Sequence, residues 1–176
     1  MTIWHSIDIN RINENDFIAV IEISKGSKTK YEMDKETGFI ILDRILSTST
    51  QYPANYGFIP KTLSDDGDPL DVLVLCTEEL QPRSLVRCYP IGMVTMIDGG
   101  KADEKIIAIP FNDPYYNEYK TLDDLPKHVS EEMLHFLSVY KALEDKVSVV
   151  KDLEGREEAV KTIIKAKQQY NKEFNK

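Results

Sequence analysis

The segment Asp66-Gly67-Asp68-Pro69-Leu70-Asp71 runs directly into the apolar stretch Val72-Leu73-Val74-Leu75. Three carboxylates therefore lie within six residues, on a part of the chain that glycine and proline bend, just before a stretch typical of a buried strand. Carboxylate oxygens and water are the ligands that hard divalent cations such as Mg²⁺ prefer. The segment predicts a metal-binding turn at the start of a core strand, with Asp68 left for proton chemistry beside the metal.

The amino-acid composition limits the class of protein. The chain has 176 residues, which is long enough to bury a sizeable core, and we expect residues 1–176 to form a single domain. Its 22 Lys and Arg residues face 30 Asp and Glu residues, which gives a net charge of −8. This balance disfavours nucleic-acid binding, which usually depends on a basic surface. It does not exclude a phosphorylated substrate, because metal ions that accompany the substrate invert the local charge.

The cysteines and the hydropathy pattern indicate a cytoplasmic protein without membrane contact. Cys76 and Cys88 lie in apolar runs and form no CxxC pair, which favours two buried free thiols in a reducing compartment. The first residues lack a basic start followed by an apolar core. No apolar run approaches the ~18 residues that span a bilayer.

Short strands fill the first two thirds of the chain. A turn is expected around Glu36-Thr37-Gly38, and Pro90 predicts a bulge or an edge position in its strand. Short, closely connected strands favour a small closed barrel over a sandwich. The predicted strands are residues 17–23, 29–33, 39–46, 70–76, 84–96 and 105–109.

Two helices are expected in the last third, on either side of a short strand at 147–150. Residues 130–144 form the first, with Ser130 as its N-cap, and residues 157–170 form the second. We therefore predict an α+β fold that is mainly β, a barrel with helices packed outside it. The helix residues expected to face the core are Met133, Phe136, Leu137, Tyr140, Leu143, Val160, Ile163 and Ile164.

Several charged residues occupy positions where apolar ones are expected. Glu22 shares a strand face with Ile18 and Val20, where a carboxylate is unfavourable unless it is neutral or paired. The alternative is that Glu22 lies at an edge and reaches solvent.

Lys30 and Glu32 share one face of the next predicted strand, and Arg44 ends the apolar row of Ile40 and Leu42. Each alone fits an ordinary surface ion pair. Together they predict a polar cavity inside the barrel.

The remaining candidate residues lie near turns and on the first helix. Asp98 opens an Asp-Gly-Gly turn, and Asp103 and Lys105 share a face of the strand after it. Tyr52 and Tyr56 occupy a loop that contains proline and glycine, where their hydroxyl groups either donate to an anion or only cap the core. Tyr140 and Lys141 lie on the first helix, where core packing is the simplest role for Tyr140. None of the three histidines is expected to bind a metal.

These residues, in this order, resemble the family I soluble inorganic pyrophosphatases of the prokaryotic type. Residues 66–71 match the family signature D-[SGDN]-D-[PE]-[LIVMF]-D, and the resemblance extends from about Trp4 to the end of the second helix. The other matching positions are Glu22, Lys30-Tyr31-Glu32, Asp43-Arg44, Tyr52-Pro53, Asn55-Tyr56-Gly57, Asp98, Asp103, Lys105 and Tyr140-Lys141.

The resemblance implies an OB-like five-stranded barrel with flanking helices, several Mg²⁺ ions per active site, with Mn²⁺ as a substitute, and a homohexamer. Val139 departs from the family, whose members often carry a second histidine there, on a helix that contributes to subunit contacts. The metal ligands implied are Asp66, Asp71 and Asp103 for the tightest ion, which Asp71 bridges to a second, and Glu22, Glu32, Asp98 and Asp103 for further ions.

The implied reaction is hydrolysis of inorganic pyrophosphate to two orthophosphates by direct attack of a metal-activated water, with Asp68 as general base. Tyr52 would support Asp68 or the metal shell. No Ser, Cys or His is placed as a nucleophile, and no GxxxxGK[ST] loop is present. The residues implied to contact phosphate groups are Lys30, Arg44, Lys105, Tyr56, Tyr140 and Lys141.

Two other classes of protein fit parts of the pattern. An OB-like barrel can bind nucleic acid or oligosaccharide without catalysis, although the net charge of −8 opposes nucleic acid. A structural Ca²⁺ protein could use Asp66, Asp68 and Asp71, although these residues do not follow the EF-hand pattern.

Overall fold

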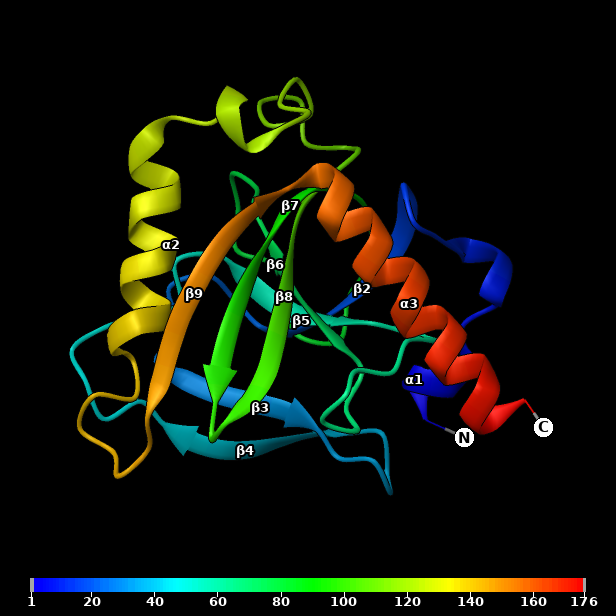
Figure 1. Cartoon of the computed structure of the whole chain (residues 1–176), viewed down its shortest axis with the longest axis horizontal. Helices are drawn as coiled ribbons and strands as arrows, with labels where there is room; N and C mark the ends of the chain where they lie inside the picture. Colours follow the sequence, from blue (N-terminus) through cyan, green and yellow to red (C-terminus); the bar gives the residue numbers. More distant parts are fainter. Residues whose placement is uncertain (1, 176) are drawn as a thin grey trace.

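The computed structural model describes residues 2–175 and contains mostly strands, with helices at its periphery (Figure 1). The helices are α1 (Ile3–Ser6), α2 (Lys127–Val139) and α3 (Arg156–Phe174), with short 3-10 turns η1 (Ile9–Arg11) and η2 (Leu122–Asp124). The strands are β1 (Ile12–Asn13), β2 (Asp16–Ile23), β3 (Thr29–Met33), β4 (Ile40–Ile45), β5 (Asn55–Ile59), β6 (Leu70–Val74), β7 (Leu85–Asp98), β8 (Lys101–Pro110) and β9 (Ser148–Gly155).

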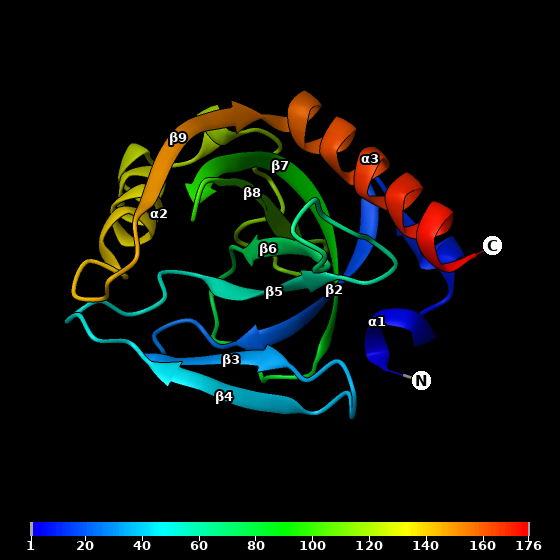
Figure 2. The ribbon, with the colours of Figure 1, turned by 60° about the horizontal axis from the view of Figure 1, so that its bottom comes forward.

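Five of the strands close into a ring. Their order is β2-β5-β6-β8-β7, and β7 also pairs with β2, so no edge is left open between them. β6 and β8 run parallel, and the other pairs in the ring are antiparallel. The predicted five-stranded, OB-like barrel with flanking helices is confirmed, and Figure 2 shows the curved strands that enclose it.

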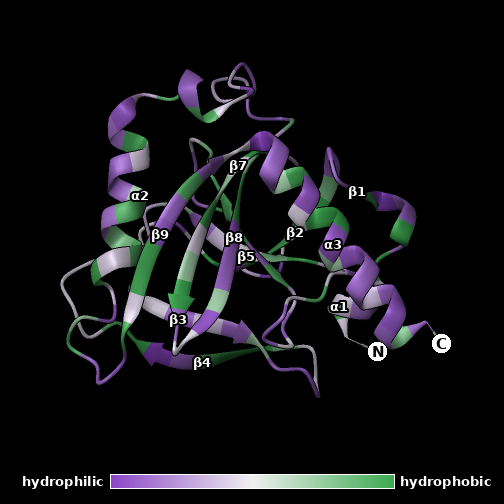
Figure 3. Cartoon of the chain, viewed as in Figure 1, coloured by the Kyte–Doolittle hydropathy of each residue, from purple (hydrophilic) through white to green (hydrophobic). Residues whose placement is uncertain are grey.

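The interior of the barrel is apolar. Alternate residues of all five strands meet there, among them Ala19, Ile59, Val72, Cys88 and Ile106. α3 adds an apolar stripe to this cluster, and Figure 3 shows that many of the other residues of this helix are hydrophilic. Because side chains alternate along a strand, the residues between these interior positions lie on the outer face of the barrel.

A second apolar cluster covers part of that outer face. Leu73 and Ile107 lie there beneath Met133, Phe136 and Leu137 of α2. α2 thus covers one side of the barrel while α3 packs against β7, and β9 runs between the two helices (Figures 1 and 2).

The strands β3 and β4 form a separate two-stranded sheet, which lies beside β2 and outside the barrel (Figure 2). Both strands lie where the sequence predicts them. The prediction that their charged residues face a cavity inside the barrel is wrong, because the barrel interior is closed and apolar.

The central strand β5 was not predicted from the sequence. Pro53 and Gly57 indicate a loop at Tyr52 and Tyr56, whereas residues 55–59 are buried between β2 and β6. Glycine is required at position 57 because β5 approaches the backbone of β2 closely, and not because the chain turns there. A Cβ atom at this position would lie 1.8 Å from the carbonyl oxygen of Val20, so only glycine permits the close approach of β5 to β2.

The helix boundaries differ from the prediction at both ends of α2, which was expected over residues 130–144 and ends at Val139. The helix begins at Lys127, directly after Pro126, whose fixed φ suits a helix start, and Ser130 lies inside the helix instead of capping it. Leu143 lies beyond the end of α2 and is 74% exposed. In α3 the buried stripe is Ala159, Ile163, Ala166 and Tyr170, and Ile164 points outward.

Other details follow the prediction. The pairing of β7 with β8 shifts register between Pro90 and Gly92, which confirms a bulge at Pro90. Cys76 and Cys88 are buried free thiols. No helix within residues 2–175 is both long enough and apolar enough to cross a membrane.

We predict that Gly57→Ala lowers the free energy of unfolding by more than about 3 kcal/mol, because the new methyl group overlaps the backbone of β2. Urea denaturation followed by circular dichroism measures this. The matched control is Gly155→Ala, where a Cβ atom meets nothing within 4 Å, and there we expect a loss below about 1 kcal/mol. Equal losses in the two variants would contradict the close-approach explanation.

Candidate functional site

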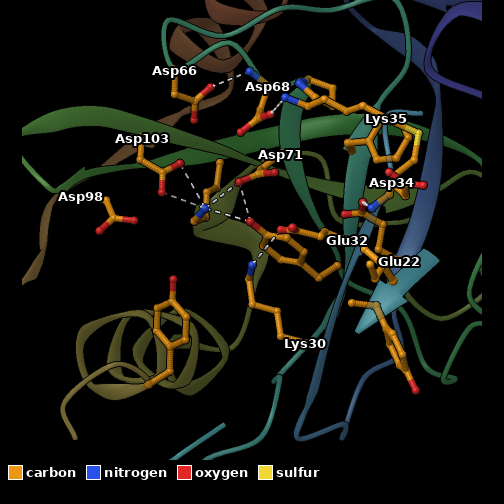
Figure 4. A pocket seen from close by; sticks show the side chains of 18 of the residues that line it. Glu22, Lys30, Glu32, Asp34, Lys35, Asp66, Asp68, Asp71, Asp98 and Asp103 are labelled. Carbon is orange, nitrogen blue, oxygen red and sulfur yellow. Dashed lines mark hydrogen bonds and ion pairs between the residues drawn. The ribbon is translucent and has the colours of Figure 1, made fainter. Parts of the chain in front are cut away.

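A cavity of about 610 Å³ lies where the outer face of the barrel meets the β3–β4 hairpin. The turn before β6, the end of β7, the start of β8 and the turn after α2 complete its walls (Figure 4). Its charged lining consists of four lysines, Lys30, Lys35, Lys105 and Lys141, and eight acidic residues, Glu22, Glu32, Asp34, Asp66, Asp68, Asp71, Asp98 and Asp103.

Lys105 is the most buried charge in this cavity, with 3% of its side chain exposed. Its Nζ atom donates to Asp71 at 2.7 Å, to the Tyr56 hydroxyl at 2.8 Å and to Asp103 at 3.1 Å. The Tyr56 hydroxyl in turn donates to Asp71 at 2.5 Å. The parallel register of β6 and β8 pairs Asp71 with Lys105, which explains why these residues meet.

The charges in this cluster perturb one another. Burial by itself would lower the pKa of Lys105, but the carboxylates of Asp71 and Asp103 raise it well above its usual value, so the ammonium group stays charged. Burial and the nearby Asp71 raise the pKa of Asp103. Burial also raises the pKa of Asp66, with a further contribution from the neighbouring aspartates. The carboxylates are thus crowded beyond what the lysines neutralise.

Glu22 lies at the back of the cavity and is 7% exposed. It accepts a hydrogen bond of 2.7 Å from the backbone N–H of Met33, which links β2 to β3. Burial, followed by the charge of Asp71, raises its pKa to about 8, so Glu22 is protonated at neutral pH. The alternative that Glu22 reaches solvent at an edge is wrong.

The turn that follows α2 supplies Tyr140 and Lys141, so the prediction that they lie on the helix is wrong, because α2 ends at Val139. Lys141 Nζ donates to Asp98 at 2.6 Å, and the Ser148 hydroxyl donates to the same carboxylate at 3.2 Å. Burial opposes ionisation of Asp98, but the hydrogen bond from Lys141 lowers its pKa. Tyr140 stacks on Phe136 at 5.0 Å between ring centres and still lines the cavity, so it serves the core and the site together.

The hairpin supplies Lys30, which lies 3.4 Å from Glu32 and 3.3 Å from Asp43. Arg44, the next residue on β4, pairs with Asp43 at 2.5 Å and with Glu144 at 2.8 Å. Arg44 is therefore held by two carboxylates and does not line the cavity.

Tyr52 also lies outside the cavity lining. It is 2% exposed and packs against Tyr56 and Phe136 at 5.5 and 4.7 Å between ring centres. Burial raises its pKa, so its hydroxyl stays protonated. All other predicted site residues line this cavity. They are Glu22, Lys30, Glu32, Tyr56, Asp66, Asp68, Asp71, Asp98, Asp103, Lys105, Tyr140 and Lys141.

Asp34 and Lys35 also line the cavity and were not predicted from the sequence. Asp34 continues the alternation of Lys30 and Glu32, and this period-two signal could have found it. Lys35 forms an ion pair with Asp68 from the turn after β3, a contact between distant segments that no local pattern reveals.

Within residues 2–175, no three His, Cys, Asp or Glu side chains are already gathered as a metal site. Asp71 and Asp103 instead share an ion pair with Lys105. Their oxygen chemistry and crowding nonetheless fit hard divalent cations, which would relieve the repulsion that raises the pKa of Asp66 and Asp103.

A concave pocket that gathers carboxylates, lysines and groups with shifted pKa values is typical of an enzyme active site. Comparison with known proteins identifies the class of enzyme. A family model described as inorganic pyrophosphatase matches residues 19–171. Soluble inorganic pyrophosphatase 2 of Chlamydomonas reinhardtii is 44% identical over 171 residues, which is 97% of this chain and 89% of that protein.

Two further relatives agree. The inorganic pyrophosphatase of Aquifex pyrophilus is 48% identical over 160 residues, 89% of this chain and 90% of that protein. The crystal structure of inorganic pyrophosphatase from Thermus thermophilus matches with a TM-score of 0.91 at 36% identity, and the match covers 96% of this chain and 98% of that one. The chain belongs to the inorganic pyrophosphatase family. This membership confirms the family and the enzyme class, an inorganic diphosphatase, that the sequence predicts.

We predict that Glu22→Gln changes the pH dependence of stability in protein freed of metals by EDTA. The folded pKa of Glu22 is raised from 4.5 to about 8, so the folded state holds a proton that the unfolded state releases, and stability falls as pH rises through this window. The amide cannot ionise. The variant should therefore gain stability relative to the parent between pH 5 and pH 9, by about 4 kcal/mol.

Denaturant titrations of both proteins at several pH values measure this difference. Parallel stability curves for the two proteins across the window would show that Glu22 does not titrate there.

Proposed function

We propose that the chain hydrolyses inorganic pyrophosphate to two orthophosphates, using several divalent cations and direct attack of a metal-activated water. Each of the compared relatives is named an inorganic pyrophosphatase, and this chain matches nearly their whole length. Mg²⁺ is the proposed ion, with Mn²⁺ as a substitute.

The observation that carries the proposal is the excess of acidic groups in the cavity. Seven carboxylates and the protonated Glu22 face four lysines, and three N–H donors of Lys105 are already used by Asp71, Tyr56 and Asp103. Without other cations such a cavity repels a compact polyanion such as pyrophosphate. Divalent ions that bind the carboxylates would reverse this repulsion.

Asp66, Asp71 and Asp103 are the proposed ligands of the tightest ion, and Asp71 would also hold a second. Asp66 and Asp103 carry raised pKa values caused by burial and by nearby carboxylates, which a bound cation would lower. For the ion to bind, Asp71 and Asp103 must give up their ion pairs with Lys105 and contact the metal instead. Further ions would be held by Glu22, Glu32 and Asp98, in addition to Asp103.

Asp68 is the proposed general base. When bound, the divalent cations lower the pKa of a shared water and neutralise charge on the phosphoryl oxygens. Asp68 stands between the two proposed ligands Asp66 and Asp71 in the sequence and lines the same cavity, which supports the proposal that its carboxylate takes the proton of the attacking water.

The proposed phosphate contacts come from both walls of the cavity. Lys30 approaches from the hairpin, and Lys141 and Tyr140 approach from the turn after α2. Burial and the charge of Asp71 raise the pKa of Tyr56, so its hydroxyl remains a donor. Such preorganised donors are usually the largest contribution to catalysis of phosphoryl transfer.

Arg44 and Lys105 can join the phosphate contacts by a change of partner. Lys105 becomes available once its aspartates bind metal. Arg44 would have to leave Asp43 or Glu144, and its Nη2 atom is buried without a hydrogen-bond partner in the described chain. Tyr52, packed behind Tyr56, would support the site through this ring contact.

The cytoplasmic location, the homohexamer and the absence of nucleic-acid and membrane partners remain proposals from the sequence and the family resemblance. So does the assignment of residues 1–176 to a single catalytic domain.

The first test measures phosphate release from pyrophosphate with Mg²⁺, beside EDTA and ATP controls. We predict rapid release that needs Mg²⁺ and spares ATP. Asp68→Asn should lower kcat by about 10²–10⁴-fold, because an amide cannot accept the proton.

The matched control for this test is Asp16→Asn, which breaks an exposed pair with Arg87 at 2.6 Å and should leave kcat unchanged. Release that survives Asp68→Asn would remove Asp68 as the base. No release by the parent protein would refute the proposed function.

We predict that Asp103→Asn raises the Mg²⁺ concentration needed for half-maximal activity by about tenfold or more, since one anionic oxygen ligand is lost. A titration of activity with Mg²⁺ measures this, again beside Asp16→Asn. An unchanged Mg²⁺ requirement would exclude Asp103 from the metal ligands.

A further inference from the structure

Lys35 reaches across the mouth of the cavity to the turn that carries Asp68. It lies in the turn between β3 and β4, and its Nζ atom forms an ion pair with the Asp68 carboxylate (Figure 4). The same atom lies 3.5 Å from the Gly67 carbonyl oxygen and 5.8 Å from the centre of the Trp4 ring. One cation from the hairpin thus contacts two adjacent residues, Gly67 and Asp68, of the turn formed by residues 64–69, which we call the acidic turn.

The backbone of the acidic turn is held independently of Lys35. The backbone N–H of Ser64 donates to the Asp68 carbonyl at 2.7 Å, and the N–H of Gly67 donates to the Ser64 carbonyl at 3.1 Å. The N–H of Asp68 donates to the Asp66 carboxylate at 3.0 Å. Removal of the Lys35 ammonium would therefore leave the path of the chain unchanged.

The turn is also anchored to α3 on its outer side. Lys165 and Gln169 donate to the Asp65 carboxylate at 3.0 and 2.7 Å. This anchor fixes the residue before Asp66 but does not reach the carboxylate of Asp68. Among residues 2–175, the Asp68 carboxylate has an ion-pair partner in Lys35 and no other hydrogen-bond or ion-pair partner.

We propose that Lys35 is a positioning residue, which orients the Asp68 carboxylate for proton transfer; this rests on the proposed function of Asp68 as general base. A half-exposed aspartate that lacks a fixed partner samples several rotamers. A base must lie within hydrogen-bond reach of the proton that it takes, and small misplacements lower the rate strongly. Lys35 supplies the partner that selects one orientation.

The ion pair is suited to orientation more than to stability. The side chains of Lys35 and Asp68 are 55% and 54% exposed, and pairs this exposed contribute little to folding. Loss of Lys35 should therefore alter the rate without unfolding the protein. Because Lys35 follows β3, the same hairpin would present Lys30 to the substrate and orient the base.

Steady-state kinetics of pyrophosphate hydrolysis test the inference in Lys35→Met, Lys35→Arg and the control Lys161→Met. Lys161 forms an exposed pair with Glu158 at 2.5 Å on α3, so its removal matches the change of charge far from the cavity. Lys35→Met should lower kcat about 10- to 100-fold with little change in KM. Lys35→Arg should restore most of the loss, and Lys161→Met should behave like the parent protein.

The variants are also combined with Asp68→Asn. If Lys35 acts through Asp68, Lys35→Met causes no further loss of kcat in the Asp68→Asn protein. Thermal unfolding midpoints that agree within about 2 °C would separate this effect from destabilisation.

Three results would overturn the inference. The same loss in both backgrounds would show that Lys35 acts elsewhere, and a raised KM at constant kcat would make it a substrate contact. Full activity of Lys35→Met would show that Asp68 needs no such partner. Each of these leaves the proposed function standing, whereas failure of the parent protein to release phosphate would refute that function first.

Discussion

The pairing of Asp71 with Lys105 on adjacent parallel strands is the interaction on which the site depends. It places a buried cation and a carboxylate at the same level of the barrel, and Asp103 and Tyr56 complete the hydrogen bonds of the Lys105 ammonium. A buried ammonium is unfavourable unless its N–H groups are satisfied, so the cluster persists only as a unit. Every other wall of the cavity is arranged around this unit.

The two faces of the same strands have different roles: one face forms the apolar barrel interior, and the other lines the charged cavity. The interior face of β6 and β8 is apolar and closes the fold, whereas the outer face carries Asp71 and Lys105. Charge therefore does not enter the barrel interior. The separate β3–β4 hairpin then covers the charged region from outside, with Met33 donating its backbone N–H to Glu22.

The sequence predicts four of the five barrel strands, the barrel and most of the cavity lining, because alternation and turn residues are local signals, but it does not predict β5. It fails where a local signal has two causes. Gly57 reads as a turn but is required by the approach of β5 to β2, and charges on β3 read as barrel-facing although β3 lies outside. Lys35 and Glu144 could not be found, because their partners Asp68 and Arg44 are distant in sequence and only tertiary packing brings them close.

The alternation of faces along β6 and β8 also determines which changes the chain tolerates. A substitution affects one face of a strand and leaves the other as it was. The loss or gain of one residue within β6 would turn Asp71 toward the apolar interior and Val72 toward the cavity, and a neighbouring strand could not compensate. The length of these two strands is therefore constrained as strictly as their residue types, whereas turns such as Gly99-Gly100 are free of this restriction.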